Sequence, residues 1–123
     1  MENVLVVDDE AHILELVSVN LLSRGYQVSE AKNGTEALAQ LRVNQPSLMV
    51  LDIKLPDFTG WELLKRMKGD PHIGTGFPVL IMTASSTETF VNLDTYPSVV
   101  EILIKPFSIT RLVSAVENAL GHP

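Results

Sequence analysis

The feature that most constrains the fold is a series of short apolar runs, each of which ends in a polar residue. The runs and the residues that follow them are 4–7 with Asp8 and Asp9, 48–51 with Asp52, 79–82 with Thr83, and 102–104 with Lys105. If the runs are parallel strands of one sheet, these polar residues share its carboxyl edge, where open α/β sheets bind ligands. Three carboxylates, a hydroxyl and an ammonium in one pocket suit a divalent cation and a phosphoryl group.

Strand-like and helix-like segments alternate along the chain, which is typical of a parallel sheet covered on both faces. The predicted strands are residues 4–7, 27–31, 48–51, 79–82 and 99–104. Apolar residues recur at helical spacing in residues 13–22, 35–43, 60–68 and 107–120. We therefore predict a single-domain α/β fold of the doubly wound type with five parallel strands. The flavodoxin-like order 2-1-3-4-5 is a common order for such sheets, and we expect that order here.

The segment between Thr83 and Val99 has the weakest helical character. It is rich in Ser, Thr, Asn and Asp, which are indifferent or poor helix formers. The pair Tyr96 and Pro97 also disfavours helical continuation. We expect a short or partly irregular fourth helix there.

Composition excludes several other classes of protein. The chain has 123 residues, of which 46% are hydrophobic and 20% charged, as expected for one globular domain. Its formal net charge of -6 argues against direct binding to nucleic acid or anionic lipid, so its partners are expected to be proteins. The chain has no cysteine, no signal peptide and no apolar stretch long enough to span a bilayer, which predicts a cytoplasmic protein.

Asp8, Asp9 and Asp52 are predicted to line one crevice. In the order 2-1-3-4-5 the helices after strands one and three lie on opposite faces, which leaves a crevice between the carboxyl ends of these strands. Two carboxylates about 4 Å apart repel by roughly 4 kcal/mol at an effective dielectric near 20. A hard cation such as Mg²⁺ offsets this repulsion and keeps open positions for phosphate oxygens. We therefore predict a magnesium site in the crevice.

Lys105 and Thr83 extend the prediction from cation binding to phosphoryl transfer. The ammonium of Lys105 can pair with Asp52 at rest and with a phosphoryl oxygen after transfer, while the Thr83 hydroxyl donates to another oxygen. Phosphoryl transfer depends mainly on positioning and charge stabilisation, so Asp52 can attack without a separate strong base. The negative charge that phosphorylation adds at Asp52 can shift the equilibrium of a nearby loop or helix between two conformations.

Four motifs carry a resemblance to a known family. They are VLVVDDE at residues 4–10, LDIKLP at 51–56 followed by Gly60, MTA at 82–84, and IKPF at 104–107. Together they resemble the receiver domain of two-component response regulators, and the resemblance covers essentially the whole chain. It implies a (βα)5 receiver domain over residues 1–123, in which Asp52 accepts a phosphoryl group from a phosphohistidine. The implied donor is a sensor histidine kinase or a histidine phosphotransfer protein, and the implied output is a downstream protein or a fused output domain.

The resemblance also assigns roles within the pocket. It implies that Asp9 and Asp52 bind Mg²⁺ directly, that Asp8 acts through water, and that the backbone carbonyl of Lys54 completes the protein ligands. Thr83 and Lys105 would bind the phosphoryl oxygens. The peptide bond before Pro106 resembles the cis bond of the family. No enzymatic activity is expected beyond accepting the phosphoryl group and slowly losing it.

Two positions depart from the family pattern or vary within it. Members commonly carry Tyr or Phe three residues before the conserved lysine, where this chain has Ile102. An isoleucine can fill the space that the aromatic ring vacates, but it cannot present a phenol to a partner. Lys54 and Ser85 occupy positions that tune the lifetime of the phosphoryl group in the family.

Three alternatives remain at the level of sequence. A degenerate receiver would keep the fold and act as a protein-interaction module without phosphorylation. A flavodoxin-like nucleotide binder would share the fold, but it should carry a Ser/Thr/Gly phosphate loop after the first strand, where this chain has Asp8, Asp9 and Glu10. A phosphohydrolase with an aspartyl-phosphate intermediate would want a second acid two residues after Asp52, where this chain has Lys54.

Overall fold

The computed structural model describes residues 2–74, 76–84 and 95–122. Five strands form one parallel sheet in the order β2-β1-β3-β4-β5. The strands are β1 (Asn3–Val7), β2 (Gln27–Ala31), β3 (Leu48–Asp52), β4 (Val79–Thr83) and β5 (Val99–Ile104). The predicted fold class and strand order are therefore confirmed.

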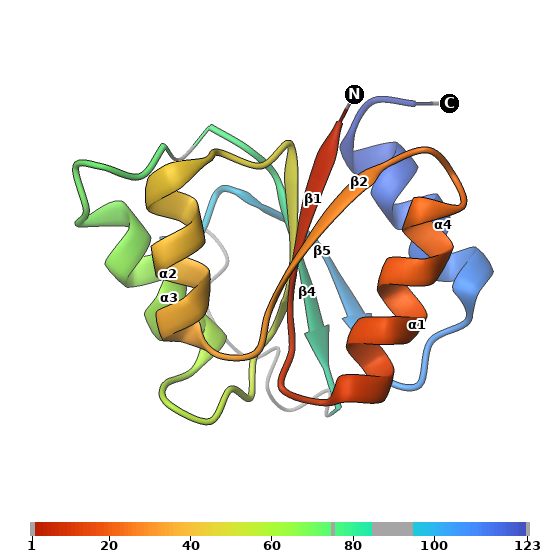
Figure 1. Ribbon diagram of the computed structural model, residues 1–123, viewed down its shortest axis with the longest axis horizontal. Helices are drawn as coiled ribbons and strands as arrows, with labels where there is room; N and C mark the ends of the chain where they lie inside the picture. The colour runs from red at the N-terminus through yellow and green to blue at the C-terminus, as the bar shows by residue number, and fades with distance from the viewer. Residues whose placement is uncertain (1, 75, 85–94, 123) are drawn as a thin grey trace.

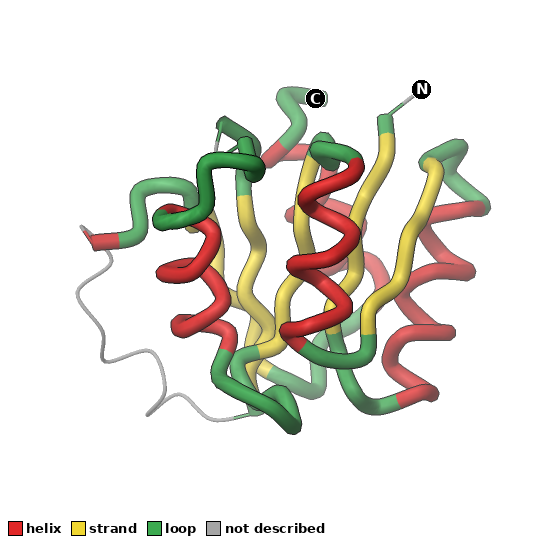
Figure 2. The backbone as a smooth tube through the Cα atoms, turned by 60° about the vertical axis from the view of Figure 1, so that its left-hand side comes forward, coloured by secondary structure: helices red, strands yellow, loops and turns green. Residues whose placement is uncertain are grey.

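Helices cover both faces of the sheet (Figures 1 and 2). α1 (Ala11–Leu22) and α4 (Ile109–Ala119) lie on one face, and α2 (Gly34–Val43) and α3 (Gly60–Lys68) lie on the other. The helix expected between Thr83 and Val99 falls largely on residues 85–94, which lie outside the described residues. None of the helices in the described ranges combines the length and the apolar character needed to cross a bilayer.

The sheet divides the hydrophobic core into two clusters because successive side chains of a strand point to opposite faces. Val7 and Leu51 pack toward α2 and α3, whereas Val6 and Val50 pack toward α1 and α4. β3 and β4 are buried along their whole length, as the continuous apolar runs predict for central strands covered on both sides. Only the ends of these strands are left to carry polar chemistry.

Side-chain caps set the first residue of three helices. Asn33, Thr59 and Ser108 each accept a hydrogen bond from the backbone amide three residues later, at 2.7, 3.1 and 3.0 Å. The cap at Ser108 explains why the last helix begins at Ile109 rather than at the predicted residue 107. Gly25, three residues after the end of α1, has a φ of +92°, a left-handed conformation that favours glycine.

Candidate functional site

The strand register brings the predicted pocket together. β1 and β3 are neighbours that pair Val7 with Leu51, so Asp8, directly after β1, comes next to Asp52, the last residue of β3. β4 and β5 pair Thr83 with Ile104, and Lys105 follows directly. The polar residues therefore share one edge of the sheet, as the sequence predicts for the carboxyl ends of parallel strands.

Lys105 links the carboxylates of the two central strands. Its Nζ lies 2.9 Å from Asp8 Oδ2 and 3.0 Å from Asp52 Oδ2. Asp8 is 0% exposed and Asp52 is 4% exposed, while the Lys105 side chain keeps 13% of its surface in contact with solvent. Burial would lower the pKa of Lys105, but its hydrogen bonds to Asp8 and Asp52 outweigh that effect and raise the pKa. The ammonium therefore stays charged at physiological pH.

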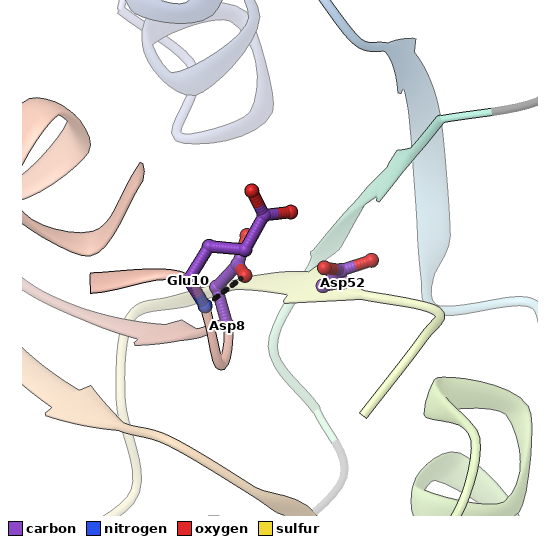
Figure 3. Close-up of side chains that lie close together, drawn as sticks. All are labelled: Asp8, Glu10 and Asp52. Atoms are coloured by element: carbon purple, nitrogen blue, oxygen red, sulfur yellow. Dashed lines mark hydrogen bonds between the residues drawn. The ribbon is translucent and has the colours of Figure 1, made fainter. Parts of the chain in front are cut away.

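Asp8 is the most strongly desolvated acid of the pocket. Burial raises its pKa to about 6, although hydrogen bonds from the Glu10 backbone amide and from Lys105 act in the opposite direction. The charge of Asp52 adds to the increase. The amide of Glu10 donates to Asp8 Oδ1 at 2.9 Å, drawn as the dashed line in Figure 3. Asp8 therefore needs a positive neighbour to remain ionised in this place.

Asp52 is held on both carboxylate oxygens. Oδ1 accepts the backbone amide of Lys54 at 3.1 Å, and Oδ2 accepts Lys105 at 3.0 Å. The Lys54 side chain is exposed. These two contacts fix the orientation of the carboxyl group at the end of β3, so that it is presented to a ligand in one defined geometry.

Thr83 closes the same edge at the end of β4. The residue is fully buried, and its carbonyl accepts the backbone amide of Lys105 at 2.7 Å. The peptide bond between Lys105 and Pro106 is cis, which agrees with the expectation from the resemblance. Ile102 is partly buried and packs against the core cluster on the α2 and α3 face.

The structure adds Glu10 to the predicted acids and sets Asp9 apart from them. Within the described ranges, the carboxylates of Asp8, Glu10 and Asp52 place one oxygen each within 4.8 Å of one another (Figure 3). Asp9 is exposed and does not belong to this group. The sequence pattern predicts no role for Glu10, because Glu10 follows the two aspartates and not an apolar run directly. The exposed carboxylate of Asp9, in the turn between β1 and α1, can still approach a cation in the pocket from the solvent side.

This donor set fits a hard divalent cation. Three carboxylates face one another, and Lys105 offsets only part of their charge. Oxygen ligands with one or two carboxylates are what Mg²⁺ prefers, and it keeps water on its remaining positions. The pocket can therefore hold a cation and an anionic group side by side.

Comparison with known proteins identifies the family. The family model of the response regulator receiver domain matches residues 4–117. The chain is 36% identical over 119 residues to the alkaline phosphatase synthesis transcriptional regulatory protein PhoP of Bacillus subtilis, covering 97% of this chain and 48% of that protein. It is 34% identical over 119 residues to the phosphate regulon transcriptional regulatory protein PhoB of Pseudomonas aeruginosa, covering 97% and 52%. The chain thus spans about half the length of these relatives.

Solved structures agree with the sequence match. A CheY-like response regulator receiver domain protein from Methanospirillum hungatei has a TM-score of 0.85 at 30% identity, over 98% of this chain and 94% of that one. The response regulator TrrA of Thermotoga maritima, solved in complex with Mg²⁺ and BeF, has a TM-score of 0.82 at 30% identity, over 98% and 100%. With the family match over most of its length, the sheet order and the acid pocket at the sheet edge, this chain belongs to the receiver domains of two-component response regulators.

Proposed function

We propose that Asp52 accepts a phosphoryl group from the phosphohistidine of a sensor histidine kinase or a histidine phosphotransfer protein. The observation that carries this proposal is the placement of Lys105, whose ammonium contacts the buried carboxylates of Asp8 and Asp52 at one sheet edge. An Asp52 oxygen attacks phosphorus and forms an acyl phosphate. The bond from phosphorus to the donor's imidazole nitrogen breaks, and the electron pair leaves with the imidazole.

The other residues of the pocket stabilise the transferred group. The Lys105 ammonium changes its hydrogen-bond partner from a carboxylate oxygen to a phosphoryl oxygen. The Thr83 hydroxyl donates a hydrogen bond to a second phosphoryl oxygen. We propose that Asp9, Asp52 and the Lys54 carbonyl hold Mg²⁺, with Asp8 acting through water. The cation would supply charge neutralisation for the phosphoryl oxygens when bound. The cluster of carboxylates that includes Asp8 and Asp52 supports a cation site here, while the roles of Asp9 and of the Lys54 carbonyl come from the family resemblance.

The consequence of transfer is a change of protein contacts. Receiver domains are generally not enzymes, and we propose that this one only accepts the group and loses it slowly, as water attacks phosphorus and releases phosphate from Asp52. The partner is proposed to be a downstream protein or a fused output domain in the cytoplasm, with residues 1–123 acting as one receiver unit. A net charge of -6 favours protein contacts over direct contacts of this domain with nucleic acid.

Acetyl phosphate provides a direct test. Incubation of the native protein with Mg²⁺ and acetyl phosphate is expected to give one phosphoryl adduct in the intact mass spectrum. Asp52→Asn should abolish the adduct because it removes the attacking oxyanion, whereas Asp70→Asn, two residues after α3 and outside the pocket, should keep it. Absence of an adduct on the wild type, under conditions that label another receiver domain, would favour the degenerate receiver instead.

A further inference from the structure

Glu10 is the residue of the pocket to which the proposed reaction gives no task. Its Oε1 lies 3.4 Å from Lys105 Nζ, and its Oε2 lies 3.5 Å from His12 Nε2. Its side chain is 47% exposed, whereas Asp8 is fully buried. Figure 3 shows the Glu10 side chain, from the turn between β1 and α1, beside Asp8 and on the same side as Asp52 at the end of β3. Glu10 therefore forms the solvent side of the pocket.

Among the described residues Lys105 pairs with three acids, and the free-energy cost of breaking the pair differs from one acid to the next. Asp8 and Asp52 are buried, so either would become an unpaired buried charge if the ammonium moved away. Glu10 is half-exposed, so water can replace the ammonium there at little cost. Among these three acids, Glu10 is thus the contact that Lys105 can give up first when it turns toward a phosphoryl oxygen.

The charge of Glu10 also acts on the two groups that the pocket is proposed to bind, the divalent cation and the anionic phosphodonor. A third carboxylate within 4.8 Å of two others attracts a divalent cation and repels an anionic donor. Because the side chain is half-exposed, solvent screens both effects and keeps them modest.

We propose that Glu10 is a positioning residue for Lys105 and that its charge sets the balance between the divalent cation and the anionic phosphodonor. This inference rests on the proposed function of the pocket. Glu10 holds the Lys105 ammonium at the mouth of the pocket until a phosphoryl oxygen replaces the Glu10 carboxylate as a partner of that ammonium. It does not exchange atoms with the substrate.

Glu10→Gln isolates the charge because it keeps the size of the side chain. Loss of the carboxylate is expected to weaken Mg²⁺ binding by about three- to tenfold. At saturating Mg²⁺, the KM for acetyl phosphate should fall by about twofold or more, because one negative charge no longer opposes the donor. The maximal rate of labelling should change less than the KM. A variant that merely folds poorly would lose both ligands together rather than shift them in opposite directions.

The experiment uses Mg²⁺ alone and then acetyl phosphate as probes. Isothermal titration calorimetry measures the Mg²⁺ affinity, and intact mass at increasing acetyl phosphate gives the KM and the maximal rate. Glu15→Gln is the matched control, because Glu15 is exposed on α1, the helix that follows Glu10, and lies outside the pocket. Glu10→Asp keeps the charge, so its Mg²⁺ affinity should stay closer to wild type than that of Glu10→Gln.

The outcomes separate this inference from the proposed function. If the wild type binds Mg²⁺ and is labelled but Glu10→Gln has the affinity and KM of Glu15→Gln, the inference is overturned and the proposed function stands. If the wild type neither binds Mg²⁺ nor becomes labelled, the proposed function is overturned and this inference falls with it. A weaker Mg²⁺ affinity together with a lower KM for acetyl phosphate in Glu10→Gln, with neither change in Glu15→Gln, supports it.

Discussion

Asp57, in the loop after β3, caps a helix from another part of the chain. Its carboxylate accepts the backbone amides of Gly34 and Thr35, each at 2.9 Å, and the Thr35 hydroxyl at 2.7 Å. The small degree of burial raises the pKa of Asp57, but these hydrogen bonds outweigh it and hold the pKa well below its ordinary value. The loop that follows the proposed phosphoacceptor is thereby fastened to the first turn of α2.

Asp57→Ala is expected to lower the free energy of unfolding by about 1 kcal/mol at pH 7, the usual cost of losing a helix cap. Since the folded pKa is depressed, this contribution is fully present above the ordinary pKa near 3.8 and is lost as pH falls below it. Urea denaturation at several pH values should therefore show a difference between wild type and variant that is constant near neutrality and shrinks below pH about 4. A difference that persists in acid would point to a cause other than the carboxylate.

Single residues also show how far the sequence predicts the pocket. Asp8, Asp52 and Lys105 could be grouped from the sequence because each directly follows an apolar run, and the register of the parallel strands brings these positions to one edge. Glu10 could not, because its reach to Lys105 depends on the angle at which the chain leaves β1 and enters α1. That angle is a property of tertiary packing, which no local pattern records. The same turn leaves Asp9 exposed beside the fully buried Asp8.

At the scale of elements, α3 is packed directly against the end of β3. The amide of Gly60 donates to the carbonyl of Ile53 at 2.7 Å. A Cβ at Gly60 would lie 2.7 Å from the Asp52 carbonyl oxygen and 3.1 Å from Ile53 Cα, both of which are backbone atoms. No side chain can move to make room, so the absence of a Cβ allows this close approach of helix to strand.

Gly60→Ala is therefore expected to lower the free energy of unfolding by about 1–3 kcal/mol, since the added methyl must displace backbone. Gly76→Ala is the matched control, because a Cβ there meets nothing within 4 Å and should change the stability by at most about 0.5 kcal/mol. Urea denaturation monitored by circular dichroism measures both. Equal stability of the two variants would contradict the close packing of α3 on β3.

The sequence predicts the bounds of an element well where its apolar pattern is continuous. It predicts them less well where a single polar side chain sets the first residue of a helix. The central strands read directly as apolar runs, and α3 was predicted with its observed bounds. The ends of the last helix were predicted too generously, because Phe107 and Leu120 fit the apolar spacing but pack on the core from outside the helix. The cap at Ser108, rather than hydrophobicity, sets where α4 begins.

At the scale of the whole molecule, the pocket joins strands from the centre and from the edge of the sheet, so a cation bound there stabilises the folded chain as a unit. Any ligand that binds only the folded state adds RT ln(1 + [L]/Kd), which is about 2.7 kcal/mol at one hundred times Kd. We expect the midpoint of urea denaturation to rise with Mg²⁺ concentration and to return to its starting value in EDTA.

Asp52→Asn should flatten this dependence, because it removes a proposed ligand of the cation. NaCl at matched ionic strength controls for screening of the acidic surface, whose net charge of -6 would itself respond to salt. A rise in the midpoint that is the same in the variant, or the same in NaCl, would show that the gain does not come from the pocket.

The route of Lys105 has a consequence for how such a domain can diversify. Its main chain continues from the border strand β5, it is tied by its amide to Thr83 of β4, and its ammonium ends between Asp8 and Asp52 after β1 and β3. One side chain therefore links the proposed phosphoacceptor in the middle of the sheet to the outer margin of the sheet. On the proposed function, substitutions confined to that margin would change the surface offered to a partner and leave the reacting atoms unchanged.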